Sequence, residues 1–193
     1  DNFWFQYKWY VVAITAITIV ISILTVQCAT RTRYDIEVVF FSYTAVLDDQ
    51  TEKIADYIEK YTNDLNGDGE VNVLVLNCSF TDSSSNSQYK YTVLTKLQAT
   101  IAGDQNAILY ITDDAAYDYL KQLSDDGGLL EGEPYPLGED FYKETETEEF
   151  GSLPEGLKIS CRRVGGTTLE KSKDAETAYN ESKKILESLK NAG

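Results

Sequence analysis

The sequence predicts an α/β protein, with an N-terminal transmembrane helix followed by a three-layer sandwich around a mostly parallel sheet of four to five strands. Residues 9–30 carry no charge. Beyond residue 34, β-branched and aromatic runs alternate with stretches of helical periodicity, as in β-α-β units with right-handed crossovers. Of the 193 residues, about 160 remain for one domain with a sizeable core.

The apolar segment is long enough to cross a hydrocarbon core of about 30 Å. The apolar region of a cleaved signal peptide is shorter, and Gln27 before Cys28 argues against a lipoprotein signal. We therefore expect a single-pass anchor in the lipid bilayer over residues 1–30 and a short linker over 31–34. An aromatic belt surrounds Lys8: Phe3, Trp4, Phe5, Tyr7, Trp9 and Tyr10.

Small hydroxyl residues share one face of this predicted helix. They are Thr15, Thr18, Ser22 and Thr25. Such a stripe permits close helix–helix contact in lipid, which would support self-association or a protein partner. The alternative is that each hydroxyl satisfies a carbonyl of its own helix. The chain starts at Asp1 and contains no methionine, so we expect further sequence before it.

The composition excludes several functions. The net charge of −15 lies on residues 31–193, and an acidic domain repels nucleic acid, so we expect no nucleic-acid partner. There is no histidine, the usual general base and the commonest metal ligand. No glycine-rich phosphate loop or nucleophile elbow is present. For Cys78 and Cys161, two buried free thiols are favoured over a disulfide.

The first half of the domain predicts a strand, a helix and a second strand. Residues 35–43 (DIEVVFFSY) form a nearly continuous apolar run, typical of a buried strand. Asp49 and Glu52 fit a capping box, and apolar side chains follow at helical spacing over 54–61. Residues 71–78 (VNVLVLNC) predict the second strand.

The second half continues the alternation. Residues 93–101 predict a helix and residues 107–112 (AILYIT) a strand, after which Thr112 or Asp113 can cap another helix. The remaining predicted elements are a fourth strand over 157–164 and a last helix over 170–190.

An acidic insertion, residues 124–156, interrupts this pattern within the soluble domain, 35–193. It holds eleven acidic residues against one lysine, together with Tyr135, Phe141 and Tyr142. So long a loop in a compact domain is usually functional or disordered. A flap that contacts a partner and a solvated insertion both remain open.

Residues 64–70 (DLNGDGE) match the first half of an EF-hand calcium loop, and similar half-loops occur in dockerin-type proteins. Asp64, Asn66 and Asp68 would supply side-chain oxygens and Glu70 its carbonyl. The position of the bidentate glutamate is taken by Val75. The sequence therefore leaves two interpretations, a structural calcium site and a tight helix-to-strand turn.

Polar side chains follow the predicted strands. In open parallel sheets, ligands bind beyond the carboxyl ends of the strands. Tyr43 follows the first strand, Asp82 the second, and Asp113 and Asp114 the third. These four residues are the candidate ligand-binding site, with the alternative that the aspartates only start loops and cap helices.

The chain resembles small membrane-anchored extracytoplasmic proteins of Gram-positive bacteria. The matching features are residues 3–9 (FWFQYKW), the single anchor, the helix–NGDG–strand unit at 54–76, residues 107–112 and the stretch 153–157 (LPEGL) before a strand with Arg162. The domain is similar to one lobe of a type 2 solute-binding protein. The resemblance implies extracytoplasmic placement. It carries no ligand over, because the second lobe that would close a cleft is absent.

Three functions are consistent with the sequence. The first is a membrane-anchored, non-enzymatic binding or interaction domain, as a component of a membrane complex. The second is a reduced solute receptor for a small ligand. The third and weakest is a hydrolase that uses a pair of carboxylates. We favour the first and expect no enzymatic activity.

Overall fold

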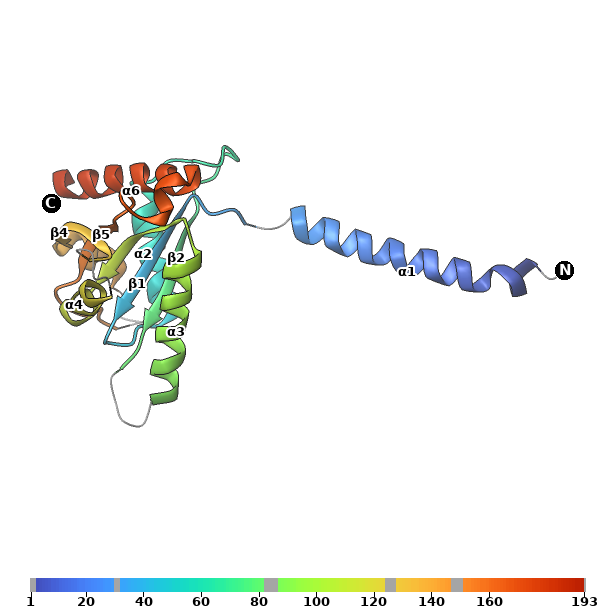
Figure 1. The fold of residues 1–193 in the computed structure, drawn as a ribbon, viewed down its shortest axis with the longest axis horizontal. Coiled ribbons are helices and arrows are strands. Elements are labelled where there is room, and N and C mark those ends of the chain that lie inside the picture. Colours follow the sequence, from blue (N-terminus) through green and yellow to red (C-terminus); the bar gives the residue numbers. More distant parts are fainter. Residues whose placement is uncertain (1–2, 30–31, 82–86, 124–127, 147–150, 193) are drawn as a thin grey trace. The chain divides into compact units, whose positions relative to one another are not determined.

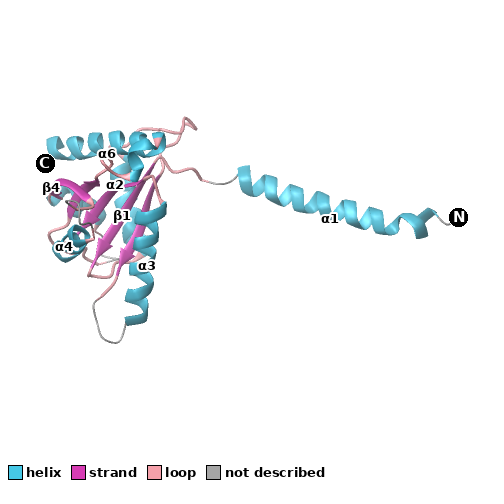
Figure 2. Cartoon of the chain, viewed as in Figure 1, coloured by secondary structure: helices cyan, strands magenta, loops and turns pink. Residues whose placement is uncertain are grey.

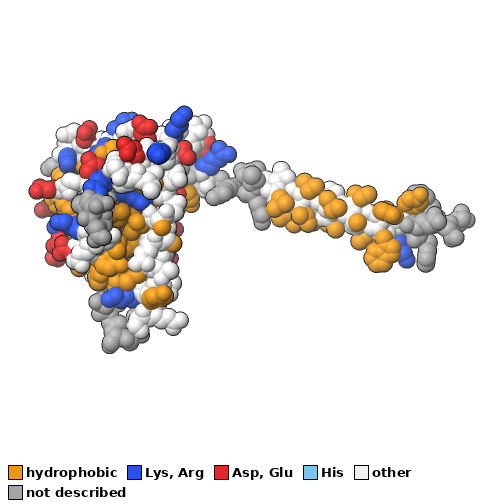
Figure 3. Space-filling view, viewed as in Figure 1, with side chains coloured by type: hydrophobic (Ala, Val, Ile, Leu, Met, Phe, Trp, Pro, Cys, Tyr) orange, Lys and Arg blue, Asp and Glu red, His pale blue; other side chains and the backbone are white. Residues whose placement is uncertain are grey.

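A computed structural model describes residues 3–29, 32–81, 87–123, 128–146 and 151–192 (Figure 1). The chain divides into two compact units, Asp1–Arg33 and Tyr34–Gly193. The first unit is helix α1, Phe3–Ala29. Its stretch Tyr7–Thr25 is the one helix among the described residues that is long and apolar enough to cross a membrane. Figure 3 shows hydrophobic side chains along the part of this helix whose side chains are described.

The second unit is built on a single mixed sheet of five strands in the order β2-β1-β3-β5-β4 (Figures 1 and 2). The strands are β1 (Ile36–Ser42), β2 (Val73–Ser79), β3 (Ala107–Thr112), β4 (Leu130–Pro136) and β5 (Lys158–Arg162). The helices are α2 (Asp48–Glu59), α3 (Ser87–Gly103), α4 (Asp114–Gln122), α5 (Glu139–Thr145), the 3-10 helix η2 (Thr168–Lys171) and α6 (Lys173–Ala192).

The α/β class is confirmed, but the prediction of a mostly parallel sheet is wrong. β1 pairs in parallel with β2 and β3, whereas β5 is antiparallel to both β3 and β4. The segment from 137 to 157 leaves and re-enters the sheet at the same end, since Leu137 N–H donates to the Leu157 carbonyl (2.9 Å). A strand that follows such a connection must run back antiparallel.

The insertion is also more ordered than expected, because it supplies an edge strand and a helix. β4 and α5 both lie inside residues 124–156. Phe141 is buried and its ring meets that of Tyr57 edge-on, at 5.2 Å between centroids. The aromatic residues of the insertion therefore belong partly to the core, which excludes a wholly solvated segment.

Two apolar layers cover the sheet. On one face, side chains such as Val38 and Phe40 of β1 pack with α2, α5 and α6. On the other, Val39 and Phe41 pack with α3 and α4. Alternation along β1 thus divides its side chains between two cores. α2 begins two residues earlier than predicted: the residue before the helix is Leu47, not Asp49. The Leu47 N–H donates to Gln50 Oε1 (2.8 Å), so the Asp49–Glu52 capping box is wrong.

Candidate functional site at the sheet edge

The four predicted ligand residues are only partly brought together. Asp113 precedes α4, and its carboxylate accepts from Ser42 Oγ (2.7 Å), Tyr43 N–H (2.8 Å) and Ala116 N–H (2.8 Å). These bonds cap α4 and fix the turn after β1. Asp114 is exposed and pairs with Lys158, and Asp82 lies outside the described residues. At this end of the sheet, Asp113 is engaged in structure.

Tyr43 belongs to an aromatic cluster. Its ring lies 4.9 Å from that of Phe80 and 5.8 Å from that of Phe41. Lys90 Nζ lies 5.6 Å from the Tyr43 ring centroid and 5.4 Å from that of Phe80. A cation of the chain itself therefore already lies over these aromatic rings.

The DxNxDG loop forms a self-bonded turn. Asp64 accepts from Gly67 N–H (2.6 Å) and Gly69 N–H (2.9 Å), and Asn66 and Asp68 each accept from the N–H two residues on. The described residues include no group of three or more His, Cys, Asp or Glu suited to a metal ion. Calcium binding by Asp64, Asn66, Asp68 and Glu70 stays a prediction. A thermal melt in millimolar calcium, compared with chelator, tests it.

Asp35 was not singled out by the sequence, yet it holds the loop that leads into β2. Its side chain is buried and accepts from the N–H groups of Leu65 (2.8 Å), Asn66 (3.0 Å) and Asn72 (2.9 Å). One carboxylate thus fixes both ends of the loop against the start of β1.

A pair of acidic side chains lies near the opposite end of the sheet from Asp113. Burial, and after it the neighbouring Asp104 carboxyl, raises the pKa of Glu37 to about 7 from its ordinary 4.5. Asp104 Oδ1 also accepts from the N–H groups of Asn106 (2.8 Å) and Ala107 (3.3 Å). A raised pKa beside a second carboxyl is what the carboxylate-pair alternative requires, but Asp104 also orders the turn into β3.

The two cysteines of the domain are separate thiols. Cys78 and Cys161 are free and buried, and burial raises the pKa of each thiol to about 11. Strands β1 and β3 lie between them, so a disulfide is excluded.

In α1, each stripe hydroxyl donates to the carbonyl four residues earlier, as Thr18 does to Ile14 (2.9 Å). Self-association through the stripe stays a prediction.

A hollow of about 300 Å³ opens between α2, α5, β4 and α6. Tyr57, Tyr61, Tyr135 and Phe141 line it. Lys60 Nζ lies 5.7 Å from the Tyr57 ring centroid, and Lys190 Nζ lies 5.8 Å from that of Tyr135. As at Tyr43, the chain's own lysines lie over rings that could otherwise receive a cationic ligand.

The two edge strands are unlike each other. β4 reads LEGEPYP, with two prolines, two glutamates and a glycine, and its pairing with β5 is interrupted between Glu131 and Tyr135. Proline, charge and irregular register are devices that prevent an edge from pairing with another strand. β2 reads VLVLNCS and pairs with β1 in unbroken register over its whole length.

Backbone hydrogen bonds establish which groups of β2 face outward. Phe80 N–H donates to the Ser42 carbonyl (3.1 Å), and the Asn72 carbonyl accepts from Asp35 N–H (2.8 Å). Even-numbered residues therefore direct their backbone groups to β1, and odd-numbered residues direct theirs away from the sheet.

Side chains cap three of the outward groups. Glu59 Oε1 accepts from Val73 N–H (3.1 Å), Lys96 Nζ donates to the Asn77 carbonyl (3.1 Å), and Asn77 Oδ1 accepts from Ser79 N–H (3.1 Å). Within residues 73–77, four outward groups remain without a partner among the described residues: the Val73 carbonyl, the N–H and carbonyl of Val75, and the Asn77 N–H. These four form an open segment at the middle of the edge.

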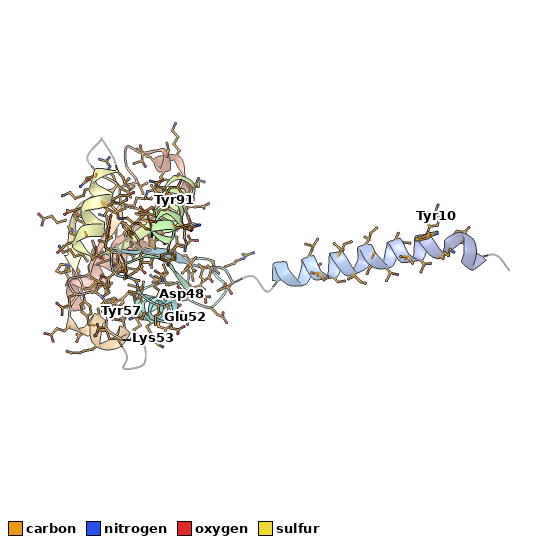
Figure 4. The ribbon with its side chains drawn as sticks, turned by 90° about the horizontal axis from the view of Figure 1, so that it is seen from below. Tyr10, Asp48, Glu52, Lys53, Tyr57 and Tyr91 are labelled. Carbon is orange, nitrogen blue, oxygen red and sulfur yellow. The ribbon has the colours of Figure 1, made fainter. Side chains whose placement is uncertain are left out.

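A groove of about 330 Å³ runs along this open segment. Residues 73–77 form its floor, α2 forms one wall and Lys96 of α3 contributes to the other. Figure 4 shows Asp48 and Glu52 close together on α2, with Lys53 and Tyr57 on the same helix and Tyr91 on α3. A hydrogen-bonding floor between two helical walls can receive an extended chain.

No protein-family model, curated protein or solved structure matches the chain. The resemblance to membrane-anchored proteins of Gram-positive bacteria therefore stays a prediction. Only a weak signal for β4 was present in the sequence, since prolines inside a short run indicate either an edge strand or no strand at all. For β2 there was none, because its apolar run has the composition of a central strand.

Proposed function

We propose that the protein is a membrane-anchored, non-enzymatic interaction domain whose β2 edge receives an extended segment of a protein partner. The observation that carries this proposal is the contrast between a protected edge at β4 and an open, groove-lined edge at β2. Addition of a strand would satisfy the four backbone groups of the open segment, and the groove would hold alternate side chains.

The anchor assigned to this function is α1, whose stretch Tyr7–Thr25 is long and apolar enough to span a bilayer. An anchored domain with an open strand edge suits a component of a membrane complex, held near its partner. We place the domain on the extracytoplasmic side. Labelling of a Tyr91→Cys variant in intact cells by a membrane-impermeant maleimide tests this, because the side chain of Tyr91 is 72% exposed. Protection of that cysteine until the cells are opened would place the domain inside.

Photo-crosslinking in native membranes tests the function itself. A photoreactive amino acid at Glu52, beside β2, is expected to give a discrete adduct, and the same amino acid at Glu133 of β4 is not. Val75→Pro removes an outward N–H without touching the ladder to β1, so it should abolish the adduct. Equal adducts from both edges, or an adduct that survives Val75→Pro, would contradict strand addition at β2.

A reduced solute receptor is the second candidate, and the tyrosine-lined hollow between α2 and α5 is the observation that favours it. A small ligand there would have to displace Lys60 or Lys190 from the rings or bind beside them. A Tyr61→Ala variant that lost binding of a small molecule, with the crosslink at β2 unchanged, would favour the receptor.

A further inference from the structure

We infer that the segment received by β2 is basic, with positively charged side chains two residues apart on the side that faces α2. This inference rests on the proposed function and specifies the chemistry of its partner. It starts from the charges of the groove walls. Asp48, Glu52 and Lys96 are the charged residues that line the groove.

Lys96, which carries the positive charge of the groove lining, already has a partner at one end of the groove. Lys96 Nζ donates to the Asn77 carbonyl (3.1 Å), the capped group that borders the open segment. Asp48 Oδ1 accepts from Asn77 Nδ2 (3.0 Å), which leaves its second oxygen without a partner among the described residues. Glu52 is exposed and forms no ion pair or hydrogen bond with any residue that the structure describes. Both available charges on the α2 wall are therefore negative.

The spacing of these carboxylates matches that of an added strand. Asp48 and Glu52 are four residues apart on a helix, which corresponds to about 6 Å along its axis. Side chains on one face of a strand repeat every two residues, which corresponds to about 6.6 Å. Two basic side chains at positions i and i+2 of the added strand can therefore meet both carboxylates.

A second copy of the chain is disfavoured as the occupant. Antiparallel pairing of β2 with β2 of another copy, about a two-fold axis perpendicular to the sheet, sets α2 beside α2. That arrangement brings acidic side chains of two strongly negative domains together, at a net charge of −15 for each chain. A basic segment from a different protein lacks this repulsion and gains from the same field.

The test uses the full chain in nanodiscs of zwitterionic lipid and two fluorescent seven-residue peptides, one alternating lysine with valine and one alternating glutamate with valine. Fluorescence anisotropy is expected to give the lysine peptide a Kd lower by about tenfold or more, as two partly exposed ion pairs would provide. The double variant Asp48→Asn, Glu52→Lys should remove that preference. The double variant Asp49→Asn, Asp56→Lys is the matched control: it makes the same change of net charge on the same helix, outside the groove lining, and should preserve the preference.

The outcomes separate this inference from the function on which it rests. Equal binding of both peptides, lost in Val75→Pro, would overturn the basic preference and leave strand addition intact. Lysine-peptide binding that survives Val75→Pro would be general surface attraction and would overturn the inference. So would the absence of binding by either peptide. A dimer that Val75→Pro dissociates would make a second copy the occupant, and would overturn it as well.

Discussion

β2 and β4 terminate the same sheet on opposite sides, but only β4 carries protection along its length. In β4, prolines and a glycine interrupt the strand, and Glu131 is tied to α6 through Tyr179 (2.6 Å) and Lys183 (3.3 Å). In β2, capping by Glu59, Lys96 and Asn77 is confined to the two ends. Unprotected edges favour aggregation. Under the proposed function, a middle segment left open between capped ends would limit β2 to a short partner strand.

The surroundings of β2 also differ from those of β4. β2 lies between α2 on one face of the sheet and α3 on the other, and residues of both helices line the groove along this strand. On the face of the domain in Figure 3, charged side chains gather around α6 and hydrophobic ones beside α3. Under the proposed function, helices on both sides of β2 would let this edge select a partner by side-chain chemistry as well as by backbone pairing.

The largest expected effect separates inward from outward residues of β2. Leu76→Pro removes an N–H that faces β1 and should lower the free energy of unfolding by about 3 kcal/mol or more. Val75→Pro removes an outward N–H and should cost about 1 kcal/mol or less. Urea denaturation followed by circular dichroism measures both. Equal losses would mean that the assignment of outward groups is wrong.

The second effect concerns the entry to β2. Asp35→Ala leaves three N–H groups without their carboxylate acceptor and should cost about 3 kcal/mol, since the site is buried. Asp64→Ala, which removes two bonds in an exposed turn, is the control and should cost about 1 kcal/mol. The same denaturation experiment compares them, and a smaller loss for Asp35→Ala would refute its role as the clamp of this loop.

The sequence was sufficient to predict the strands that have a strong pattern of apolar side chains. The runs at 35–43, 71–78 and 107–112 became β1, β2 and β3, because buried strands need β-branched and aromatic side chains wherever they occur in a sheet. β4 was missed because a strand with two prolines lacks that pattern. The direction of β5 was missed because it depends on where the preceding connection returns, which no local pattern encodes.

The candidate site was less predictable than the fold. The alternative that Asp113 caps a helix agrees with its bond to Ala116 N–H (2.8 Å). Asp35 gave no signal, because a lone aspartate before a strand reads as an ordinary loop residue. The open edge of β2 follows from strand order, and strand order comes from long-range packing that a single sequence does not contain.

A smaller effect is a pH dependence of the free energy of unfolding that arises beside β2. Glu37 of β1 pairs in register with Leu74 of β2, and its pKa is raised to about 7 from 4.5 by burial and by Asp104. The folded state then holds a proton that the unfolded state has lost between pH 4.5 and 7, so stability falls as pH rises through that window. Glu37→Gln should flatten this dependence and add about 1 kcal/mol at pH 8, after allowance for solvent screening. Denaturation midpoints at pH 5 and pH 8 measure it, and an unchanged slope in the variant would exclude Glu37 as the cause.

The smallest expected effect tests whether proline keeps the β4 edge from pairing with another copy of the chain. Pro134→Val restores a backbone N–H to that edge and should lower the free energy of unfolding by only about 0.5 kcal/mol, mainly through the unfolded chain. Pro154→Val makes the same chemical change in a segment outside the sheet. Sedimentation in detergent at high protein concentration should detect weak self-association of Pro134→Val beyond that of the natural chain and of Pro154→Val, limited by the glutamates that remain on β4. If Pro134→Val associates no more than its control, proline does not protect this edge, and the contrast with β2 would have to rest on the glutamates and the interrupted register alone.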